Sequence, residues 1–161
     1  MGSQYFKYIL GGLSIVLVYA ACRSVECPPN KTELLNKFNQ FVNATMQTKQ
    51  FYSIKEWESK DQVFSGYLQN CYPKYDSLYY LDERQKFWTD ALRYYFKRYD
   101  NRVTVELLNN KNPNSQIMQN QIKSTWANPD QAFTQIFQEM TGLKFDDAMQ
   151  AVRDSTLKSE K

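Results

Sequence analysis

The chain has 161 residues and a formal net charge of +3, contains no histidine, and is 42% hydrophobic. Its length predicts one domain of moderate size, and its small net charge gives no reason to expect a nucleic-acid partner. Because the commonest general base and metal ligand is absent, we expect no catalytic site, no metal and no cofactor.

The first element is an apolar segment near the N-terminus, in which no charged residue occurs between Tyr8 and Cys22. A helix over residues 5–22 would be about 27 Å long, which is just enough to cross a thin bilayer. The same stretch also fits a secretory signal peptide, with a short basic region at Lys7 and a cleavage site near residue 20. The segment is therefore either a retained anchor or a cleaved signal.

Small residues favour the anchor. Gly11 and Ser14 lie on one face of the predicted helix and would let another membrane helix pack closely against it. We therefore expect an uncleaved single-span anchor. The domain organisation is then an anchor and short linker (1–27), a helical domain (28–152) and a charged C-terminal tail (153–161).

Two amphipathic helices are predicted after the anchor. The first begins at Asn30 and the second at Ser53, and each has a glutamate three residues later, as in a capping box. The second ends near Cys71, shortly before a proline. The apolar faces contain Leu34, Leu35, Phe38, Phe41, Val42 and Met46 in the first helix, and Ile54, Trp57, Phe64, Tyr67 and Leu68 in the second.

The longest predicted helix covers residues 76–100 and has a seam of mostly apolar residues at alternating steps of three and four. Basic and aromatic residues alternate in segment 93–102, a pattern that nucleic-acid and lipid surfaces also use. Because Asp90 and Asp100 neutralise this region, we expect a solvated helix face, with a lipid-surface module as a minor alternative. The seam consists of Leu78, Leu81, Gln85, Trp88, Leu92, Tyr95 and Tyr99.

Shorter helices are predicted in the C-terminal part of the chain. The segment that starts at Asn101 is expected to be helical, because an isolated strand would have no partner, and residues 109–115 are expected to form a loop. Asn128 and Pro129 are a strong helix start. The whole chain is therefore predicted to be all-α, an irregular bundle of antiparallel helices. The remaining helices are predicted at residues 101–108, 117–126, 128–142 and 145–152.

The three cysteines bear on the compartment. If the first two soluble helices form an antiparallel hairpin, Cys27 and Cys71 become neighbours within disulfide distance, and Cys22 is left over. A bridge would place the domain in an oxidising compartment, whereas the alternative is three free thiols. The glycosylation sequons at Asn30 and Asn43 add little, because an asparagine-rich chain contains such matches by chance.

These features favour a non-catalytic accessory subunit of a large membrane complex. We expect it in the mitochondrial inner membrane, within a respiratory-chain or ATP-synthase assembly, with its soluble domain in the intermembrane space. Its partners would be other subunits of the complex, and the bilayer through residues 5–22. Trp57 and Trp126 are candidates for the partner surface, whereas Trp88 is expected in the core. The alternative is a secreted helical protein with a cleaved signal that binds a small apolar ligand or a protein partner.

Overall fold

The computed structural model describes residues 25–48 and 51–142. These residues form helices and connecting turns without a strand, which confirms the all-α prediction for the described ranges. The label η1 denotes a π-helix, and η2, η3 and η4 are short 3₁₀ turns. The elements are α2 (Lys31–Thr48), α3 (Ile54–Ser65), η1 (Gly66–Cys71), η2 (Tyr72–Lys74), η3 (Asp76–Leu78), α4 (Leu81–Tyr99), η4 (Asp100–Arg102), α5 (Val103–Leu107), α6 (Pro113–Thr125) and α7 (Pro129–Thr141).

Several predictions concern parts of the chain outside the described ranges. They are the anchor at residues 5–22 with its packing residues Gly11 and Ser14, the last helix at 145–152, and the charged tail at 153–161. Within the described ranges, no helix combines the length and the apolar character that a membrane span requires.

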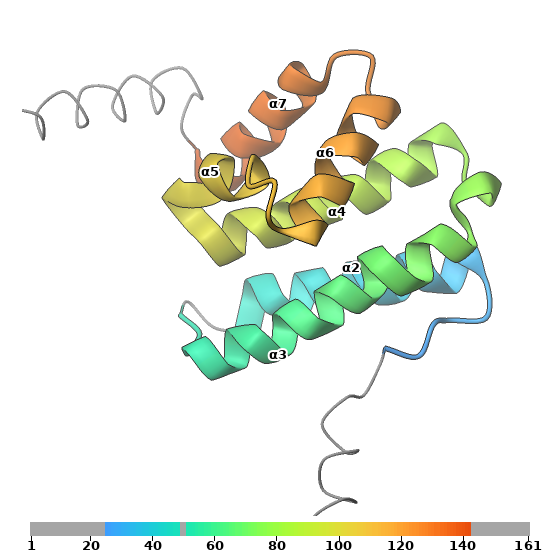
Figure 1. Ribbon diagram of the computed structural model, residues 1–161, viewed down its shortest axis with the longest axis horizontal. Coiled ribbons are helices and arrows are strands. Elements are labelled where there is room, and N and C mark those ends of the chain that lie inside the picture. The colour runs from blue at the N-terminus through green and yellow to red at the C-terminus, as the bar shows by residue number, and fades with distance from the viewer. Residues whose placement is uncertain (1–24, 49–50, 143–161) are drawn as a thin grey trace, which may run out of the picture.

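Helix α4 lies at the centre of the described domain (Figure 1). Helices α2 and α3 lie on one side of it, and α5, α6 and α7 lie on the other. Helices α2 and α3 run antiparallel to each other, as the predicted hairpin requires, and α4 then runs back alongside them. Short connections between neighbouring helices favour this alternation of direction.

Local capping signals fix where the first helices begin. The Ser53 hydroxyl accepts a hydrogen bond from the Glu56 amide at 3.3 Å, and the Glu56 carboxylate accepts one from the Ser53 amide at 2.9 Å. The predicted capping box of α3 is therefore confirmed. At α2 only half of the box forms. Asn30 accepts from the Glu33 amide at 2.9 Å, but the Glu33 carboxylate pairs with Lys37 at 2.8 Å instead.

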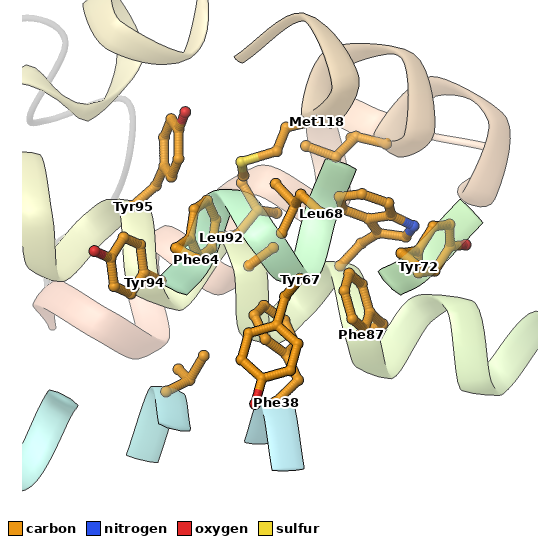
Figure 2. Packing of buried hydrophobic residues seen from close by; sticks show 14 of the residues in the cluster. Phe38, Phe64, Tyr67, Leu68, Tyr72, Phe87, Leu92, Tyr94, Tyr95 and Met118 are labelled. Atoms are coloured by element: carbon orange, nitrogen blue, oxygen red, sulfur yellow. The ribbon is translucent and has the colours of Figure 1, made fainter. Parts of the chain in front are cut away.

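Stacked aromatic rings fill the core between the helices (Figure 2). The ring of Phe38 in α2 stacks on Phe87 in α4 with centroids 4.2 Å apart, and Phe64 in α3 stacks on Tyr94 in α4 at 4.1 Å. Trp88 is fully buried among them, as predicted. Each such pair adds about 0.5–1.5 kcal/mol beyond the burial of its area, so α4 holds both helices in place.

The prediction of one continuous helix over residues 76–100 was wrong at its N-terminal end. Residues 76–78 form a 3₁₀ turn, the next two residues are extended, and α4 begins at Leu81. The cause is a local cap, because the Tyr80 amide donates to the Glu83 carboxylate at 2.9 Å. As a result Leu78 and Leu81, predicted in the buried seam, are exposed. The buried face of α4 is formed instead by Phe87, Trp88, Asp90, Ala91, Leu92, Tyr94, Tyr95 and Phe96.

Two asparagines start the later helices. Asn128 accepts from the Gln131 amide at 3.1 Å, and α7 ends at Gly142, whose φ of 70° lies in the left-handed region that glycine tolerates. Asn112 caps α6 in the same way. The predicted loop at residues 109–115 is therefore too long. Helix α6 begins at Pro113. A proline suits the first helical position, because the backbone N–H that it lacks would have no hydrogen-bond acceptor within the helix there.

Candidate functional site

A disulfide closes one end of the described domain. Cys27, just before α2, is bonded to Cys71 at the end of η1, with Cα atoms 5.2 Å apart, so the predicted pairing is confirmed. Beside the bridge, the Tyr75 hydroxyl donates to the Pro28 carbonyl at 2.6 Å. The segment that leads into α2 is thereby fixed to the segment that follows α3, at the open end of the α2–α3 hairpin. Protein disulfides persist in oxidising compartments, which is the compartment class that the sequence predicts.

At the other end of α2, a groove of about 450 Å³ opens on the surface. It lies where the α2–α3 connection meets the C-terminal ends of α4 and α7. We call it the Trp57 groove. Its lining residues are Met46, Phe51, Tyr52, Trp57, Phe96, Lys97, Arg98, Asp100 and Met140.

Trp57 forms the aromatic floor of this groove. The capping box places it in the first turns of α3, where its ring meets Tyr52 edge-on at 4.8 Å and Tyr94 at 5.9 Å. The Tyr52 hydroxyl donates to the Thr45 carbonyl at 3.0 Å, which ties the α2–α3 connection back to α2. Only 9% of Trp57 is exposed. The indole is therefore a rigid surface supported from below.

Arg98 forms one wall of the groove. Its guanidinium lies over the Trp57 ring, 5.0 Å from the centroid, and over Tyr99 at 5.2 Å. The same group pairs with Asp61, with an Nε–Oδ2 distance of 3.0 Å. Stacking on aromatic faces and a fixed ion pair are both geometries that arginine favours. The predicted solvated face therefore describes Arg98 only in part, because its guanidinium is held between aromatic rings and Asp61.

The carboxylate of Asp61 connects Arg98 to the core. The Tyr94 hydroxyl donates to Asp61 Oδ1 at 2.7 Å. Burial of the ring raises the pKa of Tyr94 well above its ordinary value, and the neighbouring charge of Asp61 raises it further. The hydroxyl accordingly keeps its proton at neutral pH and remains a donor. The chain of contacts from Tyr94 through Asp61 to Arg98 holds the wall of the groove in one position.

Two large apolar side chains are exposed close together in the sequence, Phe51 in the groove lining and Ile54 at the first position of α3. Phe51 is 81% exposed and Ile54 is 79% exposed. Ile54 was predicted in the buried stripe of α3, and this prediction was wrong. It is the first residue of the helix and turns outward, whereas Trp57, one turn later, faces inward. An exposed apolar side chain in the lining of a groove, as at Phe51, is typical of surfaces that bind a partner.

The structure does not bring the two candidate tryptophans together. Trp57 lines the groove, whereas Trp126 is half-buried against the core at the C-terminal end of α6 and does not line it. Sequence reasoning missed Phe51, Arg98 and Met140 as groove residues. They come from three different elements, and no local spacing shows that these elements meet.

The groove can hold an apolar side chain against an aromatic floor, beside a cation fixed in place. Within the described ranges, no group of three or more histidine, cysteine, aspartate or glutamate side chains is placed to hold a metal ion. No protein-family model, curated protein or solved structure matches the chain.

Proposed function

We propose that this protein is a non-catalytic accessory subunit of a large membrane protein complex. Its N-terminal residues 5–22 anchor it in the bilayer, and the Trp57 groove receives a neighbouring subunit. The observation that carries the proposal is the exposure of Phe51 in the lining of a groove that also holds a supported tryptophan and an aromatic-stacked arginine, with Ile54 exposed three residues later in the sequence.

The chemistry of the groove favours an apolar segment of another protein as its occupant. Tryptophan, tyrosine and arginine are the residues that most often dominate the energy of protein interfaces. Trp57 and Arg98 are already held in position by Tyr52 and Asp61, so a partner would bind without ordering them first. Phe51 and Ile54 would be buried around the bound segment.

The compartment is the finer part of the proposal. The Cys27–Cys71 bridge supports an oxidising space outside the cytosol. With an uncleaved anchor, we place the domain in the mitochondrial intermembrane space and the anchor in the inner membrane, as part of a respiratory-chain or ATP-synthase assembly. Gly11 and Ser14 would pack against a membrane helix of the same complex.

The test replaces these two exposed apolar residues in the full chain, as Phe51→Ser with Ile54→Ser, and measures the migration of the protein on native gels of mildly solubilised membranes. We expect the wild type to migrate with a complex of high molecular mass. The double variant should migrate as a small free species, because about 1–3 kcal/mol is lost for each large apolar side chain withdrawn from an interface.

A control removes two exposed apolar side chains at the other end of the domain. Leu78→Ser with Leu81→Ser changes two exposed leucines, one at the end of η3 and one at the start of α4, that do not line the groove. This variant should migrate like the wild type. Equal migration of all three proteins, or release by both double variants, would rule out the groove as the docking site.

The disulfide also favours a second candidate function, a secreted helical binding protein whose first residues are removed as a signal. In that case the protein would be recovered without residues 1 to about 20, in a soluble fraction. The sequons at Asn30 and Asn43 would then meet the glycosylation machinery. The mass of the native protein distinguishes this function from the first.

A further inference from the structure

Three large side chains are exposed within four consecutive residues where η3 leads into α4. Leu78 is 58% exposed, Tyr80 is 73% exposed and Leu81 is 60% exposed. Tyr79 is buried between them, because the two residues before α4 are extended and extended residues point their side chains to opposite sides. We call Leu78, Tyr80 and Leu81 the Tyr80 corner.

Lys31, in the first turn of α2, holds the Tyr80 corner in place. Its ammonium lies over the Tyr80 ring, 4.4 Å from the centroid, and donates to the Leu78 carbonyl at 3.0 Å. The same ammonium pairs with the Glu83 carboxylate at 2.6 Å. The corner is therefore fixed beside the start of α2, and little has to be ordered before it contacts another surface.

The chain enters the domain close to this corner. The segment that leads into α2 and the start of α4 lie at the same end of the domain (Figure 1). The Tyr75 hydroxyl, three residues before Leu78, donates to the Pro28 carbonyl at 2.6 Å. The segment before α2 is thus bonded to the segment that carries the corner.

A short tether limits how far this end of the domain can lie from the proposed anchor. Val25 packs against the core at Gly66, where an added Cβ would lie 2.5 Å from Val25 Cγ2. The proposed membrane span ends at residue 22. Three residues of fully extended chain cover at most about 11 Å. An anchor at residues 5–22 therefore keeps this end of the domain near the bilayer.

The other large apolar side chains exposed among the described residues lie elsewhere. Phe51 and Ile54 follow the C-terminal end of α2, a helix of 18 residues that is about 27 Å long. Val105 and Leu108 lie in α5 and directly after it, on the side of α4 that faces away from α2. The Tyr80 corner is therefore the exposed apolar group at the tethered end.

The chemistry of the corner suits the interface between membrane and water. Tyrosine is enriched there because its ring is apolar and its hydroxyl is polar, and a lysine can keep its ammonium in water while its stem contacts apolar surface. The charged groups beside the corner form pairs, Lys31 with Glu83, and Arg84 with Asp76 at 3.6 Å. These pairs carry no net charge, so contact with lipid would depend on apolar burial and not on anionic head groups.

We propose that the Tyr80 corner seats the domain on the bilayer that holds its anchor, with Leu78, Tyr80 and Leu81 inserted at the level of the lipid head groups. The inference rests on the anchored subunit of the proposed function. The tether and the corner are two points of attachment, and together they fix the orientation of the domain. They thereby also fix the orientation of the Trp57 groove, at the other end of α2.

The test attaches a nitroxide label to single cysteines of the full chain, reconstituted in phosphatidylcholine vesicles. It compares collisions of the label with oxygen, which concentrates in lipid, and with a water-soluble nickel complex. The variants are Leu81→Cys and its matched control Leu108→Cys, whose leucines are 60% and 62% exposed. Each variant also carries Cys22→Ser, so that the Cys27–Cys71 bridge stays intact and only the new thiol is labelled. We expect the oxygen-to-nickel collision ratio to be higher at position 81 than at position 108.

Flotation of the vesicles distinguishes failure of this inference from failure of the anchor. A protein that floats with the vesicles but has a water-exposed label at position 81 would keep its anchor and overturn the seating. A protein that does not float would overturn both. Lipid-exposed labels at both positions would show contact without preference for the corner, and would also overturn the proposal. The same holds if the label at position 81 enters lipid only when anionic lipid is added, because charge would then drive the contact.

Discussion

Asp100 has an unusual backbone conformation at the rim of the Trp57 groove. Among the described residues it is the non-glycine residue with a positive φ, at 49° with ψ at −124°. It ends α4 and begins η4, and its amide donates to the Phe96 carbonyl. Residues with a Cβ rarely adopt this region, and holding one there costs on the order of 1–3 kcal/mol. The strain is therefore stored where α4 meets the groove.

Replacing Asp100 with glycine should raise the stability of the domain. Glycine adopts a positive φ without steric cost, and part of the gain is offset by the freedom it adds to the unfolded chain. We expect Asp100→Gly to increase the free energy of unfolding by about 1 kcal/mol. Asp100→Ala is the matched control, because alanine keeps the Cβ and should bring no gain. Equal stability of the two variants in urea unfolding would show that the backbone is unstrained.

Buried tyrosines make stability depend on pH in the alkaline range. Burial raises the pKa of Tyr94 and of Tyr95 above the ordinary value of 10.0. In the unfolded chain these hydroxyls ionise near the ordinary value, whereas in the folded chain they stay protonated. Their contribution to stability is therefore fully present below about pH 10, and is lost as the pH rises above it.

An alkaline titration should accordingly show tyrosine ionisation and unfolding together. Exposed tyrosines such as Tyr80 should ionise near pH 10 without unfolding, whereas we expect the tyrosinate absorbance of the buried tyrosines to appear together with the loss of the helical circular dichroism signal, at higher pH. In Tyr94→Phe, the absorbance gained in that transition should be smaller by one tyrosine. If every tyrosine ionised while the helical signal stayed intact, the buried tyrosines would not be protected as the structure indicates.

At the scale of elements, the disulfide joins the segment before α2 to the end of η1. Cys27 and Cys71 are 44 positions apart in the sequence, and the bridge closes the loop that contains α2 and α3. In the chain-entropy description, a cross-link over such a loop stabilises the folded state by about 4 kcal/mol. That is a large part of the stability of an ordinary domain.

The double variant Cys27→Ser with Cys71→Ser should therefore lose most of that stabilisation. We expect its free energy of unfolding, from urea denaturation of the full chain, to fall by about 2–5 kcal/mol. Cys22→Ser serves as the control, because it changes the cysteine that the bridge does not use, and its stability should match the wild type. A double variant as stable as the control would mean that helix packing alone fixes the start of α2.

Local signals in the sequence predicted which segments are helical better than they predicted the residues at which the helices begin and end. The Ser53–Glu56 box was predictable because both partners lie within one helical turn. Spacing alone groups residues on a face, but it does not say where the helix begins. Leu78 and Leu81 were therefore assigned to a buried seam, although the cap at Glu83 starts α4 only at Leu81.

At the scale of the whole molecule, long-range contacts decide where the sites form, and local patterns in the sequence predict few of these contacts. The cysteine pair was an exception, since an antiparallel hairpin brings the two ends of its helices together. The groove depends on Met140 of α7 lying near Trp57 of α3, and no local pattern encodes that contact.

The proposed function requires a disulfide-bridged domain that remains joined to its N-terminal apolar segment. One measurement tests both parts, the intact mass of the native protein from a membrane fraction without reducing agent. We predict the mass of residues 1–161 less the two hydrogens lost in forming the Cys27–Cys71 bridge. A mass lower by the first ~20 residues, or raised by a glycan, would contradict the anchored subunit and leave the secreted protein.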